Sequence, residues 1–172
     1  MTKRRIINHW TAGNFKPNLR ELLHYHLLID DRGKLYLGYK NIEENDNCYD
    51  GSYTAHTGGG NTRSVGIAVC GMSDFKSIKN PGNLLLTKIQ LERLFETNAI
   101  QLYREGWEKA TKDNLLTHYE FGLLHPHTSS RGKIDIIYLP PFPDIKPNEV
   151  GDFIRNKTNW YLKNIKTRII MY

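Results

Sequence analysis

Apolar and polar positions change their spacing several times along the chain, and each change indicates an element. A short strand is expected at residues 5–10, and residues 25–30 and 34–38 have the alternation of a β-hairpin. Gly33 lies between the halves of this hairpin, where a three-residue loop needs a left-handed residue. Residues 64–71 are small and β-branched, which is typical of a central strand covered on both faces.

Helix-like spacing appears in two later segments, separated by a further short strand at residues 115–118. Thr87 and Gln90 have the spacing of a capping box, so a helix is expected to begin there and to end near Gly106. A C-terminal helix is expected over about residues 148–163, and its inward positions are Val150, Phe153, Ile154, Tyr161 and Leu162, with Trp160 also in the core. This order predicts an α/β fold with a central mixed β-sheet flanked by helices.

The composition fits one globular domain. The chain has 172 residues, 39% of them hydrophobic, with 14 Gly and no repeat or linker, so a single domain over residues 1–172 is expected. No run reaches the roughly 18 apolar residues of a transmembrane helix. The basic N-terminus leads into only Ile6 and Ile7, too short for a secretory signal. We therefore expect a protein made in the cytoplasm, without a transmembrane segment, acting as a monomer.

The net charge of the chain indicates an anionic partner but does not distinguish among the possible polyanions. The formal net charge of +6 favours polyanions such as nucleic acid, an anionic membrane or a cell-wall polymer. Lys and Arg are scattered, as on a solvated surface, so a specific nucleic-acid patch is not expected. Cys48 and Cys70 are too few and too far apart for a disulfide scaffold or a zinc knuckle.

Candidate functional residues lie at the ends of two predicted strands. His9 and His118 each end one, and functional sites in α/β sheets lie at such carboxyl ends. Lys133 and Asp135 stand two apart and share a face if the segment is extended. Two imidazoles and a carboxylate are a common ligand set for catalytic Zn²⁺. The alternative is that these histidines are structural or surface residues.

Several segments, in this order, carry a resemblance: residues 9–13, residues 25–30 with their turn, residues 55–61 before the central strand, and His118 with residues 133–135. The chain resembles the zinc-dependent type 2 N-acetylmuramoyl-L-alanine amidases, the superfamily shared with peptidoglycan recognition proteins and many phage lysis enzymes. The similarity covers about residues 5–140. Two features are most similar to phage and prophage members. They are the short interval between His9 and Tyr25, and residues 131–136.

The resemblance implies a zinc enzyme that cleaves the amide between N-acetylmuramic acid and L-alanine in bacterial peptidoglycan. It assigns Zn²⁺ ligation to His9, His118 and Asp135, and action on the reacting amide to Tyr25 and Lys133. Thr11, His56 and Asn61 are candidates for the substrate groove, with a turn cap as the alternative for Asn61. Such a lysis enzyme would reach the wall through a holin-type lesion or by delivery within an injection apparatus.

The sequence departs from the family pattern where many members carry a central-strand Glu, because Ala68 stands there. Zinc-bound hydroxide assisted by Tyr25 is one replacement for that base, and Glu120 is a weaker one. His125 and His127 are rival metal ligands. A peptidoglycan-binding module with a dead site and, less favoured, a basic nucleic-acid-binding domain remain alternatives.

The remaining histidines have plainer interpretations. His26 should face away from Tyr25, which favours a core histidine or one that supports a ligand, and His24 is expected at the surface. His56 lies beside three glycines, so a groove position and a flexible surface loop are equally consistent with the sequence.

Overall fold

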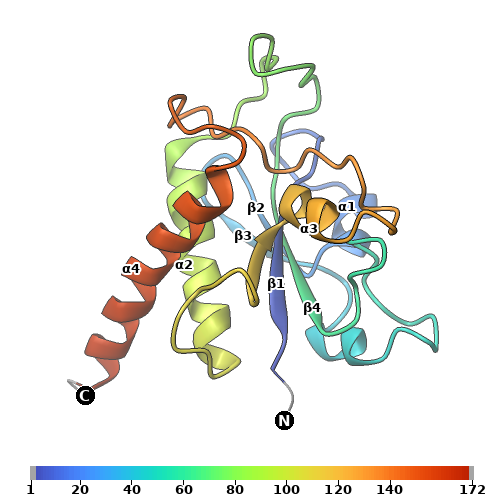
Figure 1. Cartoon of the computed structure of the whole chain (residues 1–172), viewed down its shortest axis with the longest axis vertical. Coiled ribbons are helices and arrows are strands. Elements are labelled where there is room, and N and C mark those ends of the chain that lie inside the picture. Colours follow the sequence, from blue (N-terminus) through green and yellow to red (C-terminus); the bar gives the residue numbers. More distant parts are fainter. Residues whose placement is uncertain (1–2, 171–172) are drawn as a thin grey trace.

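The computed structural model describes the backbone of residues 3–170 and the side chains of residues 3–165. Its five strands form one sheet in the order β3-β2-β4-β1-β5. The strands are β1 (Arg5–Trp10), β2 (Leu27–Ile29), β3 (Leu35–Leu37), β4 (Ser64–Val69) and β5 (Leu115–Thr117). β2 and β3 pair antiparallel and the other neighbours pair parallel, so the predicted mixed sheet is confirmed (Figure 1).

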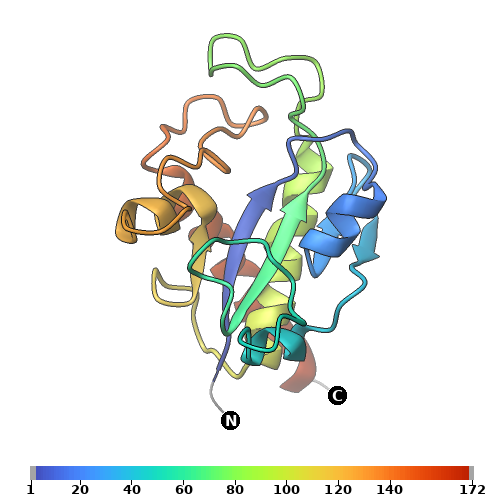
Figure 2. The same ribbon diagram turned by 90° about the vertical axis from the view of Figure 1, so that its right-hand side faces the viewer.

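Helices cover both faces of the sheet. They are α1 (Leu19–His24), the 3-10 helix η1 (Ile42–Asp46), α2 (Lys88–Arg104), α3 (His118–Leu124) and α4 (Val150–Ile170). α2 and α4 lie side by side on one face of the sheet, to the left of β1 and β4 in Figure 1 and behind them in Figure 2. On the opposite face, Phe121 of α3 packs on Ile7 and Leu116, and Leu22 of α1 packs on Leu28.

β4 is buried along its whole length, as its composition predicts. Val65, Ile67 and Val69 belong to the main apolar core shared with α2 and α4. Ala68 faces the other side, where it packs against Leu28. The capping box is also confirmed, because the hydroxyl of Thr87 accepts the N–H of residue 90 and the side chain of that residue accepts the N–H of Thr87.

Two local expectations are corrected. The strand expected at residues 25–30 is shorter, since Tyr25 caps the end of α1, a helix that the apolar pattern missed. His118 is the first residue of α3, directly after β5, and not the last residue of a strand. In both cases a capping box begins the helix: Asn18 with Glu21 in α1, and Thr117 with residue 120 in α3.

The expectation for Trp160 is wrong, because this side chain is 62% exposed. Val150, Ile154 and Leu162 are buried at multiples of four residues along α4, and Trp160 falls outside that stripe. The helix begins two residues later than expected and continues to Ile170. Within the described residues, no helix combines the length and apolarity needed to cross a membrane.

Candidate functional site

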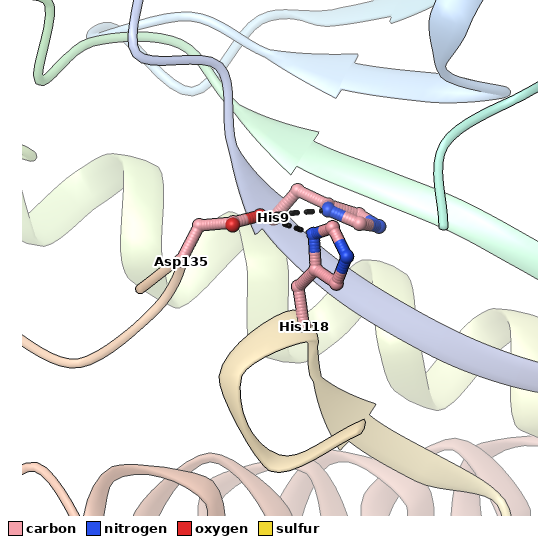
Figure 3. A group of neighbouring side chains, drawn as sticks. All are labelled: His9, His118 and Asp135. Atoms are coloured by element: carbon pink, nitrogen blue, oxygen red, sulfur yellow. Dashed lines mark hydrogen bonds and ion pairs between the residues drawn. The ribbon is translucent and has the colours of Figure 1, made fainter. Parts of the chain in front are cut away.

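Three side chains from distant parts of the chain meet at the carboxyl edge of the sheet (Figure 3). His9 is on β1, His118 begins α3 at the end of the adjacent parallel β5, and Asp135 lies on the loop after α3. The backbone N–H of Tyr119 donates to the carbonyl of Asp135 at 2.7 Å, which anchors that loop beside His118. The structure therefore brings together the three residues to which the resemblance assigns the metal.

The ligand atoms of this trio all lie within 4.8 Å of one another. Oδ2 of Asp135 is 2.8 Å from Nδ1 of His9 and 3.1 Å from Nδ1 of His118. The other ring nitrogen of His118, Nε2, is 3.0 Å from the hydroxyl oxygen of Ser130. The His118 ring thus has a polar neighbour at each nitrogen, and a neutral imidazole has only one proton to share between them.

This arrangement fits a divalent cation. If Nε2 of His118 donates to Ser130, its Nδ1 presents a lone pair to the carboxylate, and a cation between these atoms replaces their repulsion with attraction. Nitrogen and oxygen donors in a two-imidazole, one-carboxylate set suit Zn²⁺ and leave a coordination position open. His9, His118 and Asp135 are consequently able to hold a zinc ion.

The protonation states also fit. Burial lowers the pKa of His9 to about 4, so its ring is neutral at physiological pH. For Asp135, burial raises the pKa, but its close contacts with His118 and His9 oppose it and lower the pKa to about 2. A neutral imidazole and an ionised carboxylate are the forms in which these groups bind metals.

A cleft of about 740 Å³ opens onto His118 and Asp135. It is lined by all the residues expected to contact substrate or the reacting amide, namely Thr11, Tyr25, His56, Asn61 and Lys133. Arg20 and Tyr53 also line it, and the apolar pattern offered no signal for either. Its volume falls within the range of roughly 300–1,000 Å³ that is usual for ligand-binding pockets.

Tyr25 forms part of the wall next to the metal trio. Its ring centroid lies 5.1 Å from that of His9, and burial raises the pKa of the phenol above its ordinary value. The hydroxyl therefore keeps its proton at neutral pH and can donate a hydrogen bond. Lys133 is exposed and lines the same cleft as Asp135, two residues later in the chain.

Glu120 does not line the cleft. Its carboxylate receives two hydrogen bonds from Arg155, at 2.9 and 2.7 Å, and a third from the N–H of Thr117. This geometry favours a structural role for Glu120 over the expected role as a replacement for the missing base. Ala68 is fully buried and has no carboxylate. Of the described residues that line the cleft, only Asp135 carries a carboxylate.

His125 and His127 lie outside the metal group found among the described residues. The ring of His125 stacks on Phe121 with centroids 4.3 Å apart, and His127 contacts His125 edge-on. Neither side chain borders the cleft. The structure thus favours Asp135 over these two rivals as the third ligand.

His56 is only 7% exposed, which corrects the alternative of a flexible surface loop. Its Nδ1 lies 3.2 Å from Nε2 of His9, a contact that no sequence spacing indicated. His26 is buried as expected and holds the N–H of Gly66, whereas His24 borders the cleft rim. Ser130 was also missed, since an isolated serine in a loop carries no pattern.

Comparison with known proteins adds a sequence match and a set of structural likenesses. The sequence model of N-acetylmuramoyl-L-alanine amidases matches residues 1–133, a span that includes His9 and His118 but ends before Asp135. No curated protein sequence matches the chain.

Among solved structures, a mutant of PlyL is 18% identical, with a TM-score of 0.50 over 95% of this chain and 86% of that one. The Ph2119 endolysin from Thermus scotoductus MAT2119 bacteriophage Ph2119 is 17% identical, with a TM-score of 0.47 over 77% and 87%. Drosophila peptidoglycan recognition protein SA is 18% identical, with a TM-score of 0.46 over 68% of each chain. The PlyL likeness shows a shared fold.

Proposed function

Because the chain belongs to the N-acetylmuramoyl-L-alanine amidase family, we propose that it hydrolyses the amide between N-acetylmuramic acid and L-alanine in bacterial peptidoglycan, in a zinc-dependent reaction. The observation that carries this proposal is the meeting of His9, His118 and Asp135 beside a cleft that also presents Tyr25 and Lys133. A module that only binds peptidoglycan has no need of this complete set.

His9, His118 and Asp135 would hold the zinc through two imidazole nitrogens and one carboxylate oxygen. When bound, Zn²⁺ acts as a Lewis acid on a carbonyl oxygen and lowers the pKa of a coordinated water. The ionised Asp135 offsets part of the positive charge, and His9 is fully buried.

Tyr25 and Lys133 would act on the amide itself. As the carbonyl carbon becomes tetrahedral, negative charge develops on its oxygen, and fixed donors aimed at that oxygen lower the barrier. The protonated phenol of Tyr25 supplies one such donor from the buried wall. The ammonium of Lys133 supplies positive charge from the rim.

Water is the second reactant. Its oxygen joins the lactyl carbonyl carbon while the carbon–nitrogen bond breaks, and its proton leaves with the amine of L-alanine. The glycan strand and the stem peptide are therefore released from each other, each with its own backbone uncut. Thr11 and Asn61 border the same cleft, where they can orient the stem peptide.

Mass spectrometry of digested peptidoglycan tests this reaction directly. The zinc-loaded protein should release stem peptides that begin with L-alanine, and Asp135→Ala should not. Muropeptides cut only within the glycan would refute the amidase. Co-sedimentation with intact walls but no released peptide would instead identify a binding module.

We also propose that the protein serves phage or prophage lysis, as a monomer made in the host cytoplasm. The support is the similarity of residues 131–136 to phage members and the completeness of the site within one chain. Expression in a bacterial host should leave the cells intact until a holin-type lesion is introduced, after which they should lyse. Lysis without any such lesion would overturn this route, and sedimentation analysis would test the monomer.

A further inference from the structure

We propose that residues 55–64, here named the 55–64 loop, fix the proton positions on both metal-binding histidines, with His56 and Ser130 as positioning residues. This inference rests on the proposed zinc site. Each histidine reaches the loop through one intermediate side chain, and each path ends on a backbone carbonyl, that of Ser64 or that of Gly58. A carbonyl oxygen can only accept, so it sets the direction of every hydrogen bond that leads to it.

The path from His9 runs through His56. Nε2 of His56 lies 3.3 Å from the carbonyl of Ser64 and must donate to it. A neutral imidazole carries a single proton, so the Nδ1 of His56 then presents a lone pair.

Nε2 of His9 is 3.2 Å from that lone pair and 3.3 Å from the hydroxyl of Thr57. The Thr57 hydroxyl is itself 2.8 Å from Nδ1 of His56. Whichever of the two accepts, His9 has to donate from Nε2, since otherwise two lone pairs would face each other. Its remaining nitrogen, Nδ1, then has no proton and points toward Asp135.

The path from His118 runs through Ser130. The hydroxyl of Ser130 donates to the carbonyl of Gly58 at 2.7 Å, which uses its only proton. Its oxygen therefore accepts from Nε2 of His118 at 3.0 Å. Nδ1 of His118 is left unprotonated, 3.1 Å from the carboxylate of Asp135. Both histidines are thus held in the same tautomer, with the metal-facing nitrogen free.

The loop is built to hold this geometry. The side chain of Asn61 accepts the backbone N–H groups of His56 and Thr57, at 3.0 and 2.7 Å. Gly66 on β4 provides the space that the His56 ring fills, because a Cβ there would lie 2.5 Å from Cγ of His56. His56 and Ser130 are both buried, so water does not compete for these contacts.

Zinc affinity, measured by competition with a chromophoric chelator at one fixed pH, tests the inference without reference to catalysis. His56→Leu removes the Nδ1 acceptor and leaves Nε2 of His9 only its 3.3 Å contact with the Thr57 hydroxyl. His56→Asn is similar in size to His56→Leu but keeps an oxygen that can accept from His9. We expect His56→Leu and Ser130→Ala to bind zinc about 10- to 100-fold more weakly than wild type, and His56→Asn to lose clearly less. His127→Ala, in an exposed position, is the control and should bind as wild type does.

Circular dichroism of the metal-free proteins establishes that each variant is folded. If His56→Leu does not fold, His56→Asn and Ser130→Ala carry the test. Equal zinc affinities for the Leu and Asn variants, or for Ser130→Ala and wild type, would overturn the inference while leaving the proposed function intact. A wild-type protein that binds no zinc would refute the proposed function itself.

Discussion

The ion pair between Glu120 and Arg155 offers a sharp test of whether Glu120 is structural or catalytic. Arg155 extends from α4 and contacts both carboxylate oxygens of Glu120, as well as the carbonyl of Leu115 on β5. The Arg155 side chain is 5% exposed and that of Glu120 is 16% exposed. A Cβ on Gly151 would lie 2.1 Å from a carboxylate oxygen, so the start of α4 is shaped around this pair.

Glu120→Ala leaves a buried guanidinium short of its main partner. Removing one member of a buried pair costs about 3–5 kcal/mol, and Arg155 keeps Leu115 and Asp152 as partners, which places this term at the lower end. The same carboxylate accepts the N–H of Thr117 in the capping box of α3, a contact worth about 1 kcal/mol. We therefore expect a loss of about 4 kcal/mol in the free energy of unfolding, or roughly 8–16 °C in Tm for a domain of this size.

Calorimetry and initial rates separate the two interpretations. If Glu120 is structural, Glu120→Ala lowers Tm as calculated, and turnover on peptidoglycan well below the new Tm stays within about tenfold of wild type, far from the 10²–10⁴-fold loss of a general base. Glu120→Gln should fall between the two in stability, since it keeps one acceptor for Arg155. An unchanged Tm together with a loss of more than about 100-fold in turnover would show that Glu120 is the base and that our reasoning is wrong.

Three further outcomes are expected. Lys133→Ala should retain zinc but lose about 10²–10³-fold in turnover, as for the loss of one oxyanion donor, and full activity would remove Lys133 from the mechanism. Asp135→Ala should weaken zinc binding in metal analysis while His127→Ala should not, and the reverse would redraw the site. Burial lowers the pKa of His26 to about 4 in the folded protein. As the pH falls below about 6.5, this side chain is therefore protonated in the unfolded chain before it is protonated in the folded protein. Urea unfolding of the metal-free protein should show stability falling toward pH 4 by roughly 3 kcal/mol from this group, and His26→Gln should flatten the profile.

Sequence patterns located the elements that depend on local rules. The hairpin turn at Gly33 has the expected positive φ of 79°, and Thr87 begins a helix as its capping box indicates. The same rule, applied to Asn18 with Glu21 and to Thr117 with Glu120, would have found α1 and α3 as well. These helices span six and seven residues, too short for a clear apolar period, so only their first turns carry a signal.

The resemblance was sufficient to propose His9, His118 and Asp135 as ligands, but it did not indicate that His56 and Ser130 contact two of them. The residue type of Trp160 suggests burial, but its position on α4 lies outside the buried stripe that Ile154 and Leu162 define. The contact between His56 and His9 depends on the empty space above Gly66, a feature of packing between strands and a loop. No spacing along one segment encodes such a contact, because it arises only when the segments are assembled.

The central position of β1 has a consequence for the order in which the fold can form. Arg5 of this strand pairs with Ser64, 59 residues later, and Ile6 pairs with Leu115. Pairings between strands so far apart close large loops before any contact compensates for the lost entropy, and they form slowly. One hydrogen-bonding edge of β1 therefore stays open until β4 has been synthesised, and the other stays open until β5 has been synthesised. β1 is the first of these five strands to be made, yet its pairing is complete only after the last has been made, and the site at its carboxyl end needs Asp135 as well.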